Sequence, residues 1–202
     1  MGRRSGSSND IAQEAARIYV EESLTDYGAA KRKAAARLGF SVRSGLPDNA
    51  RVQAEVLAYQ RLFGGQEYLA QLQALRRTAV SAMQLLAAFN PRLVGSTVTG
   101  AISKAHRVQL HAFPAKQELV DVFLHERRIE MVADEREYRW SDGRVAAVPL
   151  ARFEAGAVGV DVALFAVGEE RQAPISPADG KPAKRLTLVE AEALAALPVE
   201  VL

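Results

Sequence analysis

The residues best suited to chemistry lie around a glycine-serine turn in the middle of the chain. Gly95-Ser96 follows a short apolar strand, and a second strand is expected at residues 108–113. Arg107 and Gln109 alternate along that strand and therefore point to one face. Hard metal ions prefer carboxylate ligands. Arginine is a permanent cation and glutamine a neutral amide, so neither side chain binds such an ion as strongly as a carboxylate does. These residue types favour ion pairing over metal chemistry.

This pattern resembles the signature of the nucleotidyltransferase superfamily, in which an apolar residue and Gly-Ser precede, by about ten residues, a strand with two carboxylates at alternate positions. Ten residues separate Ser96 from Arg107 in this chain. The resemblance covers residues 93–113 well and the strand-helix-strand pattern to residue 166 loosely. It also extends to bacterial nucleotidyltransferase-like proteins with a helical N-terminal half. It implies that the turn lies beside nucleotide phosphates, and that a third carboxylate falls on Asp161.

The chain departs from this signature at both carboxylate positions, which hold Arg107 and Gln109. In the family, as the resemblance implies, these carboxylates hold divalent metal ions that bridge the phosphates. Asp161 alone would bind Mg²⁺ weakly, and a charged residue within an apolar strand needs a partner. We therefore expect little or no metal-dependent transfer and predict that Arg107 pairs with Asp161. The alternative is that Asp161 points outward or caps a backbone group.

Three functions fit these residues. The first is a catalytically degenerate protein, with no cofactor expected, that binds a nucleotide or other phosphate-bearing ligand; its site residues would be Gly95, Ser96, Arg107, Gln109 and Asp161. The second is an active transferase that recruits Mg²⁺ through Asp161 and Glu130, with His111 as base, although a lone histidine on a strand is more often a packed or surface residue. The third is an interaction or dimerisation module with a relic site.

Composition excludes several other classes of protein. The chain has 202 residues, a formal charge of +2 and no cysteine, which excludes disulfides, thiolate nucleophiles and Cys-ligated zinc. Three histidines argue against a His-rich metal site. No apolar run approaches a membrane span, and residues 1–8 lack the apolar core of a signal peptide, so a cytoplasmic protein is the default expectation.

Basic side chains supply only weak support for nucleic acid as a partner. The near-balanced charge requires any basic surface to be local. Runs of basic residues on a helix usually form a solvated face. A basic loop near the C-terminus could nevertheless contact phosphate if it folds over the site. The residues concerned are Lys31, Arg32, Lys33 and Arg37, the pair Arg76-Arg77, and the loop residues Lys181, Lys184 and Arg185. The sequence does not indicate an oligomeric state.

The elements that must position these residues change in character near residue 90. Residues 1–8 read as a disordered start, and the apolar period and capping residues of residues 9–90 predict helices. Residues 91–202 predict an α+β domain with a mixed sheet and one intervening helix at about 115–126. Its strands are expected at 93–95, 108–113, 128–133, 137–140, 145–150 and 158–166, with a hairpin turn at Ser141-Asp142-Gly143. The fold class is therefore α+β, and the short link at residues 90–92 favours close packing of the two halves.

Overall fold

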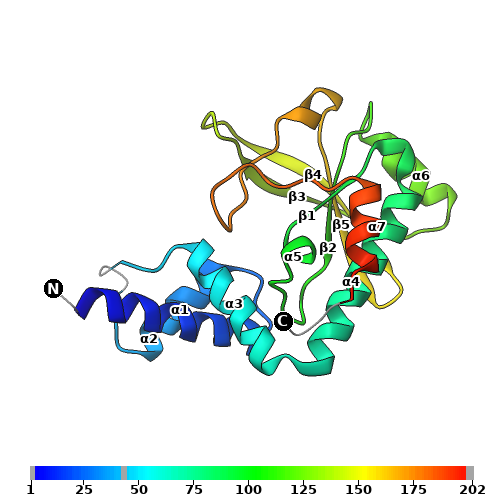
Figure 1. Ribbon diagram of the computed structural model, residues 1–202. Coiled ribbons are helices and arrows are strands. Elements are labelled where there is room, and N and C mark those ends of the chain that lie inside the picture. Colours follow the sequence, from blue (N-terminus) through cyan, green and yellow to red (C-terminus); the bar gives the residue numbers. More distant parts are fainter. Residues whose placement is uncertain (1–2, 42–44, 199–202) are drawn as a thin grey trace.

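The computed structural model has the predicted α+β architecture, with a helical N-terminal region beside a mixed β-sheet (Figure 1). It describes residues 3–41 and 45–198. Within these residues, no helix is long and apolar enough to cross a membrane. The sheet carries the candidate site.

The N-terminal region consists of α1 (Arg3–Glu21), α2 (Tyr27–Arg37) and α3 (Asn49–Phe63), which enclose an apolar core of their own. The side chains of Asp26 and Asp48 accept hydrogen bonds from backbone N–H groups in the first turns of α2 and α3. α1 begins earlier than expected, so residues 3–8 are helical where a disordered start was predicted. Extending an existing helix adds one hydrogen bond per residue and avoids the cost of nucleation.

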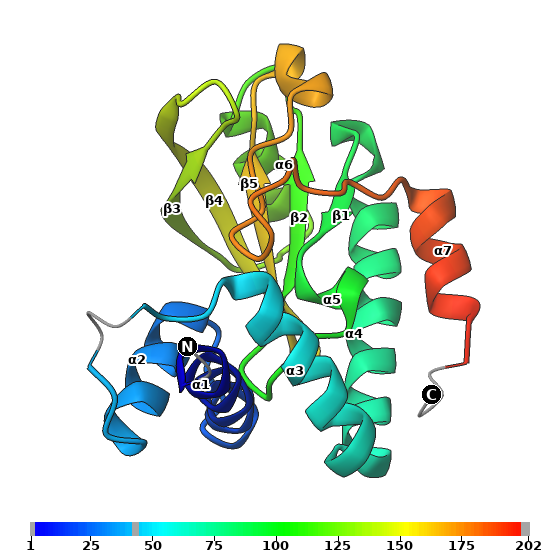
Figure 2. The same cartoon turned by 60° about the vertical axis from the view of Figure 1, so that its left-hand side comes forward.

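The long helix α4 (Gly65–Leu85) belongs to the core of the sheet. Its buried side chains contact residues of the central strands, and α6 (Glu118–Glu126) and α7 (Leu188–Ala196) join the same core. α7 lies along the outer side of α4 (Figure 2). The predicted boundary at residue 90 therefore marks the change from helix to strand and does not separate the two apolar cores.

The sheet has the strand order β1-β2-β5-β4-β3. β2 and β5 are parallel, whereas the other neighbouring strands are antiparallel, which makes the sheet mixed as predicted. The strands are β1 (Arg92–Val94), β2 (Val108–Ala112), β3 (Met131–Arg139), β4 (Val145–Ala155) and β5 (Val158–Leu164). Two separate strands were expected at 128–133 and 137–140, and this was wrong. One strand forms because β3 pairs with β4 along its whole length.

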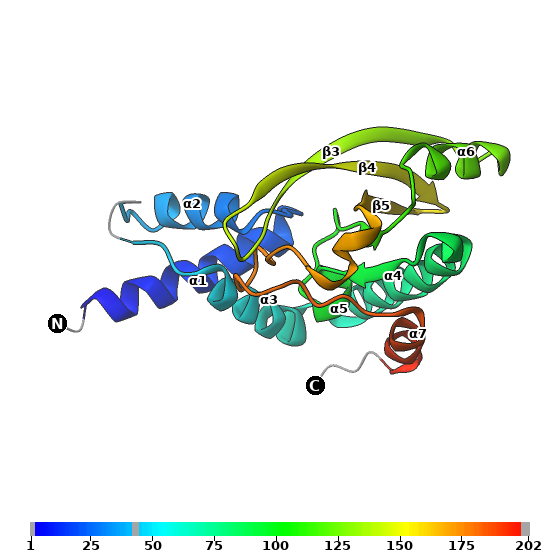
Figure 3. The same cartoon turned by 90° about the horizontal axis from the view of Figure 1, so that it is seen from above.

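The two faces of the sheet have different roles. One face packs on α4 and α6 through apolar side chains such as Leu110 and Val162. The long β3–β4 hairpin arches away from α4 and α7 (Figure 3). Because side chains alternate along a strand, residues 107, 109 and 111 share the opposite face with residues 159 and 161. That face carries the candidate site.

Helices of both regions hold the segment that leads from the glycine-serine turn to β2. The Gln60 side chain donates to the Ile102 carbonyl at 2.8 Å, and Gln71 donates to the Ser103 carbonyl at 2.8 Å. The Tyr68 hydroxyl donates to the carbonyl of Gly100. This segment runs directly into Arg107, so the helices determine where Arg107 enters the sheet.

Candidate functional site

Strand register brings the predicted site residues together. Gln109 on β2 lies opposite Asp161 on the parallel neighbour β5, and it lies opposite Val94 on the antiparallel neighbour β1. Gly95 follows Val94 directly, so the turn and the two strands meet at one place in the sheet. Asp161 is buried, which excludes the alternative that its side chain points outward into solvent.

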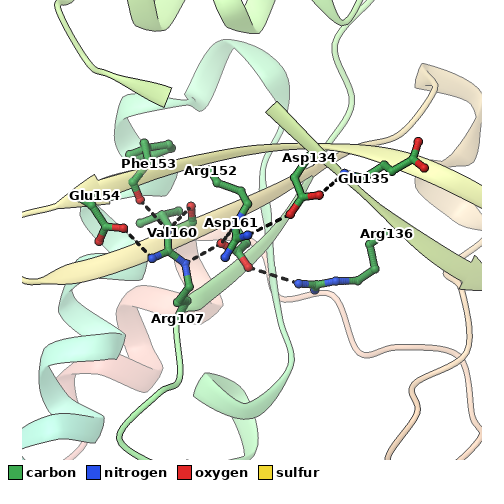
Figure 4. Close-up of polar contacts among 9 residues, drawn as sticks. All are labelled: Arg107, Asp134, Glu135, Arg136, Arg152, Phe153, Glu154, Val160 and Asp161. Carbon is green, nitrogen blue, oxygen red and sulfur yellow. Dashed lines mark hydrogen bonds and ion pairs between the residues drawn. The ribbon is translucent and has the colours of Figure 1, made fainter. Parts of the chain in front are cut away.

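Arg107 reaches across β5 and contacts Asp161, as predicted. Its Nε donates to Asp161 Oδ1 at 2.7 Å, its NH1 donates to Glu154 Oε1 at 2.6 Å, and its NH2 donates to the Phe153 carbonyl at 3.0 Å (Figure 4). The guanidinium lies directly over Gly159, where a Cβ atom would collide with it. All three guanidinium nitrogens are therefore engaged within the protein, and the absence of a side chain at residue 159 makes room for them.

Two further arginines share the same carboxylate. Arg152 Nε donates to Asp161 Oδ1 at 3.2 Å, and Arg136 NH2 donates to Asp161 Oδ2 at 3.2 Å. Arg152 also donates to Asp134 Oδ2 at 2.9 Å. Reasoning from the sequence missed these residues because their proximity depends on the register of β3, β4 and β5. The signal that could have revealed Arg152 is a charged residue within the apolar strand β4.

Charge is balanced within this group of side chains, which we call the Asp161 cluster: Arg107, Arg136, Arg152, Asp134, Glu154 and Asp161. Burial disfavours the charged form of Arg107, but the hydrogen bonds to Glu154 and Asp161 outweigh it and raise the pKa of this guanidinium. A backbone hydrogen bond from Glu135, together with Arg152, lowers the pKa of Asp134. Both shifts favour the ionised forms of Arg107 and Asp134.

The turn residues lie at the edge of this cluster. Gly95 has a φ of 77°, and the Gln109 amide lies where a side chain at residue 95 would have to be, so the turn requires glycine. Ser96 begins the short helix α5 (Ser96–Thr99), and its side chain interacts with Tyr19 of α1. The structure thus brings the five predicted binding residues into one neighbourhood and connects them to the helical region.

His111 lies farther along β2 in an aromatic cluster. It packs against Phe165 and Tyr138, and its Nδ1 accepts a hydrogen bond from Arg185 Nε at 3.0 Å. Burial, followed by the charges of Arg185 and Arg136, lowers the pKa of His111 to about 3. The side chain is only 2% exposed, which agrees with the alternative of a packed histidine and gives it poor access to a substrate.

The remaining candidates are distributed elsewhere on the surface. Glu130 lies in an exposed hollow with His125 and Met131, away from the hydrogen bonds of Asp161. Lys181 and Lys184 are exposed, whereas Arg185 packs over aromatic rings. Among the described residues, no group of three or more carboxylate, histidine or cysteine side chains could hold a metal ion.

The basic face of α2 is largely neutralised by neighbouring groups. Lys33 and Arg37 pair with Glu22, and Arg32 lies 3.7 Å from Asp26. The Lys31 ammonium donates to the Pro47 carbonyl. These contacts agree with a solvated, paired helix face and add no support for binding of nucleic acid.

Comparisons with known proteins add little to this geometry. No family model matches the chain, and no curated protein matches it. Among solved structures, it is similar to a chain in the structure of the GLD-2/RNP-8 complex, with 18% sequence identity and a TM-score of 0.29. The match covers 52% of this chain and 42% of that chain. A likeness of this size carries no argument about fold or function.

Proposed function

We propose that this chain is a nucleotidyltransferase-like protein without metal-dependent transferase activity, and that it binds a phosphate-bearing ligand, such as a nucleotide, on the charged face of its sheet. The observation that carries the proposal is the environment of Asp161, whose carboxylate accepts hydrogen bonds from three guanidinium groups. To ligate Mg²⁺, Asp161 would have to release these groups, and their positive charges oppose the approach of a divalent cation.

The position of Asp161 in the sheet also supports the resemblance on which the proposal rests. The signature requires a third acid on a strand beside the one that carries the first two positions. β5 is the direct neighbour of β2, and Asp161 lies opposite Gln109. Arg107 contacts the same carboxylate from the other motif position. Arg107 therefore lies beside Asp161, the residue at the third acidic position of the signature.

The exposed arginines of the cluster are the groups best placed to meet a phosphate. The side chains of Arg136 and Arg152 are 39% and 37% exposed, against 24% for Arg107. A planar guanidinium can donate two parallel hydrogen bonds to phosphate oxygens. In this proposal Arg107 holds Asp161 in place, while Arg136 and Arg152 supply the charge and Gly95-Ser96 borders the ligand.

Thermal stabilisation by ATP or inorganic triphosphate, measured with EDTA and then with Mg²⁺, tests this proposal. We expect stabilisation without Mg²⁺, and at least about tenfold weaker binding after Arg136→Gln and Arg152→Gln, since a hydrogen bond to a charged group contributes about 1.5–3 kcal/mol. Arg139→Gln is the matched control, because Arg139 lies on the other face of β3.

Two results would contradict the proposal. Stabilisation that requires Mg²⁺ would favour an active transferase that recruits acids from elsewhere. Absence of stabilisation by either ligand, under both conditions, would favour an interaction module whose site is a relic.

A further inference from the structure

A groove on the helical region has no role in the site on the sheet. It has a volume of about 410 Å³ and lies between α1 and α3. Glu55, Tyr59 and Leu62 line one wall at helical spacing, and Asp10 and Arg17 on α1, seven residues apart, line the other. Both helices thus present a continuous side-chain stripe to the groove. A groove between two such stripes is a surface into which a further helix can pack.

The floor and rim of the groove expose large apolar side chains. Leu62 is 75% exposed, Phe63 is 69% exposed, and Leu38, which follows α2, is 41% exposed. The Phe63 ring lies 4.8 Å from that of Tyr59, so the apolar surface is continuous. A cluster of exposed apolar side chains at a concave site marks a binding surface more often than scattered single residues do.

The groove is acidic as well as apolar. Arg17 is already bound by Glu14 at 2.7 Å and by Glu21 at 2.8 Å. Asp10 and Glu55 also line the groove, and no basic side chain of residues 8–41 and 45–198 forms an ion pair with either of them. Their uncompensated charge would attract lysine or arginine side chains of a partner.

We propose that this groove binds an amphipathic helix of a partner protein, with apolar anchors at i, i+3 or i+4, and i+7 and with basic residues beside them. The anchors would pack against Leu38, Leu62 and Phe63, and the basic residues would pair with Asp10 and Glu55. A second copy of this chain fits less well, because a two-fold contact through the groove would place the acids of both copies close together. The proposal is independent of ligand binding on the sheet.

Fluorescence anisotropy with a labelled helical peptide tests this docking site. The probe is a peptide of about 14 residues with leucine at the apolar positions of a heptad and lysine elsewhere; a second probe carries glutamate in place of lysine. We expect the lysine peptide to bind at least about tenfold more tightly than the glutamate peptide, a difference typical of complementary charge at an interface.

Variants of the full chain then locate the binding site. Leu62→Ser with Phe63→Ser should weaken binding of the lysine peptide by at least about tenfold, as for apolar anchors of an interface. Asp10→Lys with Glu55→Lys should reverse the preference between the two peptides. The matched control is Leu119→Ser with Val122→Ser, which removes exposed apolar side chains from α6 and should leave binding unchanged.

Three outcomes would overturn the proposal. They are equal affinity for the two peptides, unchanged binding after Leu62→Ser with Phe63→Ser, and a dimer in sedimentation velocity that the same two substitutions abolish and that the peptide cannot displace. The last result would assign the groove to a second copy of this chain.

Discussion

At the scale of single residues, Arg107 packs beside the buried Asp161 and balances its negative charge. A buried carboxylate is stable only with partners for its charge and lone pairs, and Asp161 has three. The planar guanidinium of Arg107 can satisfy several acceptors at once, which a lysine could not do with the same geometry. The fit depends on Gly159, over which the guanidinium lies.

Gly159→Ala tests this arrangement. The added methyl group would displace the guanidinium of Arg107 from its hydrogen bonds with Asp161 and Glu154, so we expect the free energy of unfolding to fall by about 1–3 kcal/mol, as for lost hydrogen bonds to charged groups. Chemical denaturation measures the change. Gly168→Ala is the control, since nothing lies within 4 Å of its added methyl group, and it should change stability by less than about 0.5 kcal/mol. Equal effects of the two substitutions would contradict the predicted collision.

The contact between Arg107 and Asp161 could be predicted from the sequence, whereas the rest of the cluster could not. The two residues occupy matching positions of one motif, and a buried acid needs a cation. Arg136 and Arg152 join Asp161 only because β5 pairs with β4 and β4 pairs with β3. Nothing local in the sequence fixes this register. The role of Gly159 likewise depends on a side chain that crosses from another strand.

At the scale of elements, the half-buried His106 and the buried His111 connect segments that are distant in the sequence. His106 Nδ1 accepts from the Ser103 backbone N–H at 2.8 Å, and its Nε2 lies 3.1 Å from the Tyr19 hydroxyl of α1. Burial lowers the pKa of His106 to about 4. His111 connects β2 to Arg185 in the same neutral state. Both connections require an uncharged ring.

This requirement predicts a loss of stability at acidic pH. The ordinary histidine pKa of 6.5 applies to the unfolded chain, which therefore binds protons as pH falls through 6.5 while the folded histidines stay neutral until about 4 for His106 and about 3 for His111. Stability is present above pH 6.5 and falls below it, by about 1.4 kcal/mol per pH unit for each histidine. Denaturation curves between pH 7 and 5 measure this slope.

Substitution of single histidines separates this effect from other titrations. His106→Asn should lower the dependence of stability on pH by about 1.4 kcal/mol per pH unit, the contribution of one histidine. This holds whatever the substitution does to stability at pH 7. His111→Asn should lower the slope by a similar amount, because burial also lowers the pKa of His111 in the folded protein. Identical slopes for the wild type and both variants would show that His106 is not neutral in the folded protein.

Local signals determine helix caps, whereas pairing between strands determines how far some elements extend. Asp26, Asp48 and Thr187 cap helices, and such a cap is local because it is satisfied by backbone groups two or three residues away. The continuity of β3 was missed because its exposed charged residues, such as Asp134 and Glu135, lack the alternation of apolar side chains that indicates a strand. Pairing with β4 decides its length.

At the scale of the whole molecule, α4 joins the helical region to the sheet. It follows α3 directly in the sequence, yet its buried side chains lie in the core of the sheet. The helical region has a separate core that includes Ala101 from the segment leading to β2. We therefore expect the sheet to depend on α4 for its stability.

Two fragments test this dependence. A fragment that begins at Gly65 keeps α4 and should unfold cooperatively on heating. One that begins at Pro91 loses the buried residues Leu72, Leu75 and Met83 from the core, at about 1.5–3 kcal/mol each, which is comparable to the total stability of a domain. It should show no cooperative unfolding by circular dichroism. A cooperative transition in the shorter fragment would contradict the dependence on α4.

The central claim is that Arg107 occupies the carboxylate of Asp161 and thereby prevents it from binding a metal ion. Binding of Mn²⁺, followed by electron paramagnetic resonance, tests this claim most directly. We expect no binding that depends on Asp161 in the natural chain. In Arg107→Asp with Gln109→Asp, whose folding is checked by circular dichroism, two carboxylates join Asp161 on one face and should create a metal site. Mn²⁺ binding by the natural chain that is lost in Asp161→Asn would contradict the claim.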